Sequence, residues 1–199
     1  MKNHFKSIIV LCFITLLSID ANAQVFKHGV GAQLDIFSFK DSYTDGSGLN
    51  HPVSVSPIPG LVYKATLSMY VSKTRHLHIS LATYPFIGHY ANTTDASRLV
   101  AEIPLLVEFY YGDIDYFGAF AGIGAAYSYS AIPNFGDGTI IGPQIEGGVQ
   151  FPFAGQVIAA KLAYTYGLND PGATVFPERT YSKSDRGIFS MGLIYVFGG

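Results

Sequence analysis

Cysteine and charge are both scarce in this chain of 199 residues. It contains one cysteine, Cys12, and no tryptophan, and only 13% of its residues are charged. Because the cysteine lies in the apolar N-terminal segment, the remainder of the chain has neither disulfides nor thiol chemistry available to it. An ordinary soluble domain carries about a quarter charged residues. A chain so poor in charge should therefore expose part of its surface to something other than water.

Two further features are missing, a basic block and a long apolar run. The 12 Lys and Arg are outnumbered by 14 Asp and Glu, which makes nucleic acid an unsuitable partner. Beyond the N-terminal segment, no stretch provides the ~20 uninterrupted apolar residues of a spanning helix. The most apolar stretch, Ile103–Tyr127, is interrupted by Glu108, Asp113 and Asp115. If the chain enters a bilayer it must do so as a closed barrel, which pairs every backbone polar group internally.

The N-terminal segment has the organisation of a secretory signal peptide. Two lysines precede an apolar run from Ser7 to Ile19, and Ala21-Asn22-Ala23 forms an A-x-A cleavage site. We expect residues 1–23 to be removed on export and residues 24–199 to form a single domain.

Apolar and polar residues alternate with a period of two, as in strands that bury one face. In one stretch Leu105 and Val107 share a face, whereas Glu102 and Glu108 lie on the other. Such segments occur at 25–39, 57–71, 75–87, 98–111, 115–129, 139–152, 156–167 and 186–198. Most of them exceed the usual soluble strand of about five or six residues. Their length suits tilted strands that cross a bilayer.

The connections between these segments alternate in length. Long polar loops are expected at 40–56, 88–97, 130–138 and 168–185, and tight turns at 72–74, 112–114 and 153–155. An up-and-down barrel with short periplasmic turns and longer extracellular loops has this pattern. The predicted fold is therefore all-β, an eight-stranded antiparallel up-and-down transmembrane β-barrel.

Aromatic residues cluster near the predicted strand ends. Such clusters are typical of the aromatic girdles at the two membrane interfaces, although aromatic residues also favour strands in general. The clustered residues are Tyr84, Phe86, Tyr110, Tyr111, Tyr116, Phe117, Tyr127, Tyr129, Tyr164 and Tyr166.

Four segments resemble the small bacterial outer-membrane barrels, the porin family of OmpA- and OmpX-like eight-stranded proteins. They are residues 102–112, 118–127, 162–170 and 191–199. The resemblance implies a place in the outer membrane of a Gram-negative bacterium, in contact with outer-membrane lipid and lipopolysaccharide. It also implies insertion by the outer-membrane assembly machinery, which reads a final strand ending in an aromatic residue; here Phe197 is followed by two glycines. The family has no shared activity, so the fold does not supply a function.

We predict that inward-facing polar residues form a network in the barrel lumen. Opposite charges in so narrow a space must be well hydrogen-bonded to repay their desolvation. The network either fills and specifies the barrel or lines a narrow, gated pore. Glycines at 118, 122 and 124 are expected on the lumenal face, where they leave room for larger neighbours. The predicted set is Lys27, Gln33, Asp35, Lys64, Thr66, Glu102, Glu108, Gln144, Glu146, Gln150 and Lys161.

One short motif raises a catalytic alternative. His78-Ile-Ser80 resembles the His-x-Ser of eight-stranded lipid A deacylases, in which a carboxylate completes a nucleophilic triad. No acid stands near Asn92, where that family's pattern would place it, and His78 is predicted at the periplasmic end rather than near the outer surface. His76 and His78 have the spacing of a metal pair, but no third ligand is evident. We therefore expect no catalytic residue, no metal and no cofactor.

The function expected from these features is a structural or surface-interaction role without enzymatic activity. Loops on a rigid scaffold commonly carry binding, so a possible extracellular ligand is expected at loops 40–56 and 168–185. The alternatives are a lipid A-modifying hydrolase, a narrow passive pore and, from another class, a soluble periplasmic lipocalin-like barrel.

Overall fold

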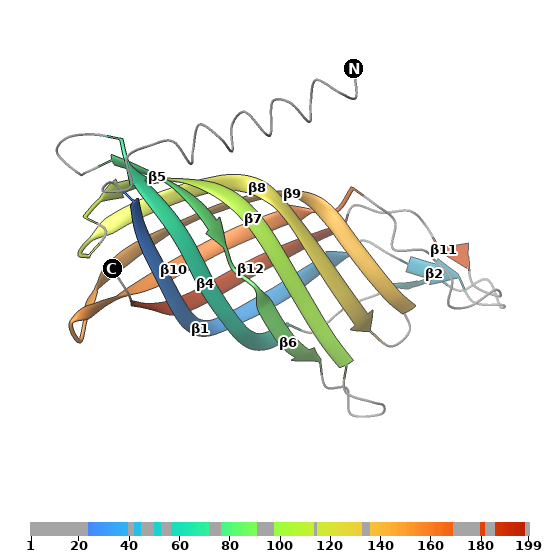
Figure 1. Cartoon of the computed structure of the whole chain (residues 1–199). Helices are drawn as coiled ribbons and strands as arrows, with labels where there is room; N and C mark the ends of the chain where they lie inside the picture. Colours follow the sequence, from blue (N-terminus) through green and yellow to red (C-terminus); the bar gives the residue numbers. More distant parts are fainter. Residues whose placement is uncertain are drawn as a thin grey trace, which may run out of the picture.

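The chain folds into a closed all-β barrel, as predicted (Figure 1). The computed structural model describes residues 24–39, 42–44, 50–52, 57–71, 77–90, 98–113, 115–132, 136–168, 180–181 and 186–197. The predicted signal peptide lies outside these ranges. Among the described residues, no helix is long and apolar enough to cross a membrane.

The barrel wall is one antiparallel sheet that closes on itself. Its strands are β1 (Gln24–Phe39), β4 (Ile58–Tyr70), β5 (Leu77–Thr83), β6 (Phe86–Tyr90), β7 (Arg98–Gly112), β8 (Gly118–Ile132), β9 (Gly136–Phe153), β10 (Gln156–Tyr166) and β12 (Arg186–Phe197). Closure occurs at β1, which pairs with β12 on one side and with β4 on the other. Both β5 and β6 pair with β4 and with β7, so together they form one crossing of the wall. The wall thus has the eight predicted crossings.

The third crossing is interrupted at Tyr84-Pro85, which the prediction of a single strand over 75–87 did not include. Proline has no N–H to donate to a ladder, so it marks a break in a sheet. The backbone nevertheless stays attached here, because the carbonyl of Pro85 accepts a hydrogen bond from the Tyr63 N–H at 2.9 Å. Beyond the break, the strand continues to Tyr90.

Two hairpins define one end of the barrel, which we call the turn end. The β9–β10 hairpin turns through Ala154 (φ 50°) and Gly155 (φ 78°), and two positive φ values in a two-residue loop are typical of a type I′ turn. The β7–β8 hairpin turns at residues 113–117. The tight turn predicted at 72–74 lies outside the described residues.

The opposite end is the loop end, and here one prediction was wrong. The expected long loop at 130–138 is mostly strand, because the β8–β9 ladder continues to the pair Ile132–Gly136. Only residues 133–135 separate the two strands, so long and short connections do not strictly alternate.

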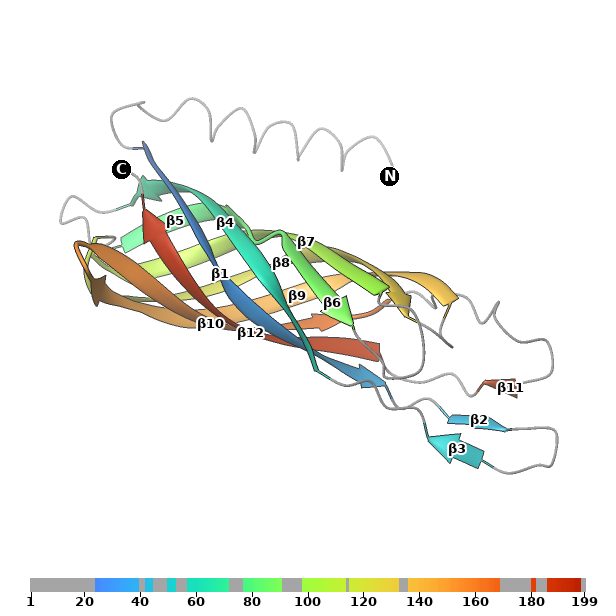
Figure 2. The ribbon, with the colours of Figure 1, turned by 90° about the horizontal axis from the view of Figure 1, so that it is seen from below.

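A second, smaller sheet lies beyond the loop end (Figure 2). It consists of β2 (Ser42–Thr44), β3 (Asn50–Pro52) and β11 (Thr180–Tyr181), with β2 in the middle. The ladder pairs Tyr43 with both His51 and Tyr181. This sheet therefore joins the two long loops, 40–56 and 168–185, which the sequence analysis treated as separate.

Because side chains alternate in direction along each strand, the wall has an apolar outer surface and an interior filled by side chains. Leu61, Leu105 and Ile145 are exposed on the outer surface, at 75%, 58% and 58%. Their neighbours in sequence point inward and are buried. The aromatic assignment was wrong for three residues: Tyr84, Phe86 and Tyr110 are buried in the interior rather than exposed in a girdle.

The lumen as the candidate functional site

The structure buries every polar residue of the predicted lumenal set. The eleven residues come from β1, β4, β7, β9 and β10, and each is at most 7% exposed. Nine of them fall into three groups along the barrel, which we call the loop-side, central and turn-side clusters; Thr66 lines a small cavity, and Gln144 stands opposite Thr165 of β10.

The central cluster is built around Tyr84, which continues the inward-facing row of Ser80 and Ala82. Lys161 Nζ lies 4.1 Å from the centre of the Tyr84 ring, and Lys64 Nζ lies 5.1 Å from it. A cation near an aromatic ring is attracted by the ring's quadrupole, and more strongly when both are out of water. The Tyr84 hydroxyl donates a hydrogen bond to the Glu108 carboxylate. One tyrosine thus contacts two lysines and one glutamate.

Gly122 allows a second carboxylate to join the central cluster. The β7–β8 ladder pairs Gly122 with Glu108, and the β8–β9 ladder pairs it with Glu146. A Cβ added to Gly122 would lie 3.0 Å from Cγ of Glu146 and 3.2 Å from Cγ of Glu108. The glycine therefore leaves the room in which the two acids approach each other, as the sequence analysis expected of this face. The central cluster comprises Lys64, Tyr84, Glu108, Glu146 and Lys161.

The loop-side cluster carries carboxylates that lack full hydrogen bonding. Gln33 Nε2 donates to Asp35 Oδ1 at 2.8 Å, and the Thr165 hydroxyl donates to Glu102 Oε1 at 3.2 Å. Within the described part of the chain, the second oxygen of each carboxylate has no hydrogen-bond partner. Lys161 interacts electrostatically with both acids. It thus links the loop-side cluster to the central one.

Apolar side chains fill the lumen between the loop-side cluster and the loop end. They are at most 1% exposed and belong to the buried apolar core. Phe86 and Ile58 illustrate the packing, since a Cβ on Gly88 would lie 2.5 Å from the Phe86 ring and 2.8 Å from Ile58. We call this group the apolar cap: Ile58, Phe86, Val100, Ile140 and Ile188.

The turn end is held by polar contacts instead. Lys27 forms an ion pair with Asp115 of the β7–β8 turn. Gln150 of β9 donates its side-chain amide to the backbone oxygens of Asp113 and Tyr116, at 3.3 and 3.5 Å. Residues of β1 and β9 thus hold the β7–β8 turn in place. These contacts form the turn-side cluster.

A small cavity separates the central and turn-side clusters. Its volume is about 10 Å³, and its lining includes Lys27, Lys64, Thr66 and Ser80. Such a space is enough for roughly one water molecule, which needs polar partners. Thr66 Oγ1 is one of the buried atoms with no hydrogen-bond partner among the described residues. The cavity suits a bound water and is too small for an organic substrate.

The His78-x-Ser80 motif is buried at the turn end of the lumen. Ser80 Oγ lies 2.8 Å from Ser68 Oγ, within hydrogen-bond distance. The His78 ring packs between two tyrosines, 4.5 Å from the ring centre of Tyr70 and 5.3 Å from that of Tyr110. Both residues are at most 2% exposed. The position matches the predicted end of the barrel.

The described ranges contain no group of three or more His, Cys, Asp or Glu side chains that could hold a metal ion. His76, the other residue of the suggested pair, lies outside these ranges.

Sequence reasoning missed three members of the site, Tyr84, Thr165 and Asp115. Tyr84 was assigned to an outer girdle, although the period-two alternation that buries Ser80 and Ala82 continues through it. Asp115 lies in the β7–β8 turn, and its pairing with Lys27 joins residues 88 positions apart, which has no local signal.

Comparison with known proteins defines the fold. No protein-family model matches the sequence, and no curated protein matches it. The solved structure of the outer-membrane protein OprG from Pseudomonas aeruginosa is similar, with a TM-score of 0.51 and 14% sequence identity. The match covers 89% of this chain and 97% of OprG. The chain has the fold of the small outer-membrane β-barrels.

Other outer-membrane barrels match less well. Ail of Yersinia pestis has a TM-score of 0.46 at 8% identity, over 88% of this chain and 99% of Ail. Neisserial surface protein A has a TM-score of 0.44 at 14% identity, over 86% of this chain and 97% of its own. For an outer-membrane barrel with eight crossings, a lumen filled by side chains is the expected geometry.

Proposed function

We propose that this protein resides in the outer membrane of a Gram-negative bacterium and acts through its surface, in a structural or surface-interaction role. The filled lumen is the observation that carries this proposal. The apolar cap, the central cluster and the turn-side cluster occupy successive levels of the barrel, and the cavity between the last two measures about 10 Å³. Such a lumen suits neither passage of a solute nor access of a substrate to His78 and Ser80.

The small sheet beyond the loop end supports a role at the surface. Ladder pairing between β2 and β11 ties loops 40–56 and 168–185 together, so a ligand there would meet a joint surface of both loops. Export through the predicted signal peptide, insertion by the assembly machinery and contact with lipopolysaccharide belong to the same proposal. The final strand, which that machinery would read, ends at Phe197.

Planar-bilayer recording tests the closed lumen. The purified protein should insert without producing discrete conductance steps. A matched control combines Phe86→Ala, which removes part of the apolar cap, with Tyr84→Ala, which removes the ring of the central cluster. This double variant should produce measurable conductance steps. Regular conductance steps from the unaltered protein would instead establish a pore.

Mass spectrometry of lipid A tests the absence of enzymatic activity. Cells that express the protein should contain the same lipid A species as cells that express Ser80→Ala. Loss of an acyl chain only with the unaltered protein would establish the hydrolase and overturn the proposed role.

A further inference from the structure

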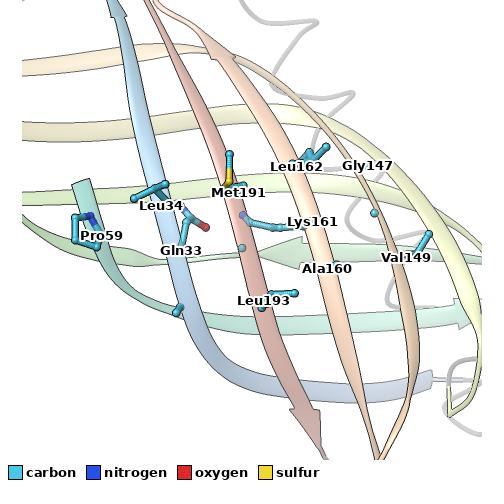
Figure 3. Close-up of a pocket in the computed structure, with 13 residues that line it drawn as sticks. Gln33, Leu34, Pro59, Gly147, Val149, Ala160, Lys161, Leu162, Met191 and Leu193 are labelled. Carbon is cyan, nitrogen blue, oxygen red and sulfur yellow. The ribbon is translucent and has the colours of Figure 1, made fainter. Parts of the chain in front are cut away.

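The outer wall contains a groove that the lumenal site does not explain. It has a volume of about 830 Å³ and runs across β4, β1, β12, β10 and β9 (Figure 3). Because the strands are antiparallel neighbours, the groove crosses them along the direction of their hydrogen bonds. Two outward rows of side chains and one inward row between them form it.

Large side chains form the first outward row. Leu34 pairs with Met191, and Met191 pairs with Leu162. Opposite residues of an antiparallel pair lie on the same face, so these three make a ridge on the outer surface. Leu162 is 54% exposed.

The second outward row is low on β1 and β10 but carries the exposed Leu193, at 60%, on β12. It holds Ala32, Leu193 and Ala160, which are paired in the same two ladders. Alanine stands on either side of Leu193, so the surface is low at both neighbouring strands. On β9 the second row continues with Val149, opposite Ala160, whereas the first row ends at Gly147, opposite Leu162. The ridge is therefore missing at Gly147, where an added Cβ would have only the Phe120 carbonyl oxygen within 4 Å, at 3.6 Å.

The inward row supplies the floor without exposing charge. It consists of Gln33, Gly192 and Lys161, and the central residue has no side chain. Lys161 lines the groove, yet its ammonium group lies on the other side of the wall, 4.1 Å from the Tyr84 ring centre. The groove is therefore apolar at its rims and uncharged at its floor.

The surroundings determine what can fill such a groove. The outer face of this wall is apolar, as required of a surface in contact with hydrocarbon. A water molecule in the groove would lack the polar partners it needs, whereas an empty groove would forfeit the dispersion contacts of its lining. A flexible methylene chain satisfies both conditions.

We propose that the wall groove holds an acyl chain of a membrane lipid and retains it longer than the rest of the wall retains its lipid neighbours. The acyl chain lies over the small side chains of Ala32 and Ala160, beside the ridge of Leu34, Met191 and Leu162. We call this part of the groove the seat. The inference goes beyond the proposed surface role and requires only that the wall face a bilayer.

The absence of tryptophan makes the test direct. Phe189→Trp places a single reporter on β12, two residues before Met191 and outside the groove lining. Phe109→Trp places a control on β7, where Phe109 is exposed on the outer surface. Each purified variant is titrated in detergent micelles with a phospholipid that carries brominated acyl chains, which quench tryptophan fluorescence.

Quenching of Phe189→Trp should saturate, with its midpoint at a lipid fraction several-fold lower than in Phe109→Trp. Adding Ala160→Leu, which fills the seat, should shift its curve onto that of the control. If Ala160→Leu reduces folding yield, Gly147→Ala is the second filling variant, because its Cβ has room. Coincident curves for the two reporters, or no effect of either filling variant, would overturn the inference.

Light scattering in the same micelles tests whether a second copy of the chain, rather than a lipid, fills the groove. A dimer that Ala160→Leu dissociates would show that a second copy of the chain fills the groove, and the acyl-chain assignment would fail. If Phe109→Trp is not quenched in lipid vesicles, the wall does not face lipid, and the membrane location itself fails.

Discussion

Lysines and carboxylates occur together at two levels of the lumen, the central cluster and the turn end. These two places differ in their access to water. In the central cluster Lys161, Glu108 and Glu146 are all at most 7% exposed. At the turn end, the Lys27 side chain is 9% exposed but that of Asp115 is 66% exposed. A buried charge that loses its partner stays out of water, whereas an exposed one is rehydrated. A lysine and carboxylate together should therefore contribute much to the free energy of unfolding in the middle of the barrel and little at the turn end.

The largest effect is expected from Lys161→Met. Its removal takes away a cation that interacts electrostatically with Glu146, Glu102 and Asp35, and leaving buried charges without a partner costs about 3–5 kcal/mol. The free energy of unfolding, measured by urea titration in lipid vesicles, should fall by that amount. A loss below about 1 kcal/mol, the value typical of a surface pair, would remove the distinction between the two levels.

A double variant provides the control. Glu146→Gln removes one of the buried acids that interact with Lys161, so Lys161→Met with Glu146→Gln should recover part of the lost stability. If the two losses simply add, Lys161 and Glu146 are not coupled.

Tyr84→Phe should have a smaller effect on the same cluster. The ring and its contacts with both lysines remain, but Glu108 loses the hydroxyl that donates to it. Leaving a buried acceptor unsatisfied costs about 1–3 kcal/mol. Urea unfolding in vesicles measures the loss, and Tyr63→Phe, on the outer surface, is the matched control and should change little. Equal effects at the two tyrosines would contradict the assigned hydrogen bond.

The wall was largely predictable because period-two alternation decides which face of each strand is buried. Glu102 and Glu108 were assigned inward from their apolar neighbours alone, and the structure places both inside. To predict that Glu108 and Glu146 approach each other across Gly122, one would need the register of β7, β8 and β9. Register depends on where each hairpin turns, which alternation does not determine.

Tyr84 shows where residue type misleads. It was assigned to a girdle because aromatic residues near strand ends often face the interface, but the alternation along its strand turns it inward, where its ring contacts two lysines. Likewise, the loop predicted at 130–138 is a continued hairpin. Gly136, Asp137 and Gly138 are turn formers, yet all three pair in the ladder between β8 and β9.

The smallest effects are expected at the turn end, and they should be unequal. Lys27→Met removes the buried partner and leaves Asp115 hydrated, so it should change stability by only about 0–1 kcal/mol. Asp115→Asn leaves Lys27 near the mouth, where its long stem can carry the ammonium group towards water. It should cost more than Lys27→Met because the largely buried Lys27 is left without its partner, but less than Lys161→Met because the stem of Lys27 can reach water. Urea unfolding of the three variants in parallel gives the order, and a larger loss for Lys27→Met than for Asp115→Asn would show that the ion pair, rather than burial of one partner, determines stability at the barrel mouth.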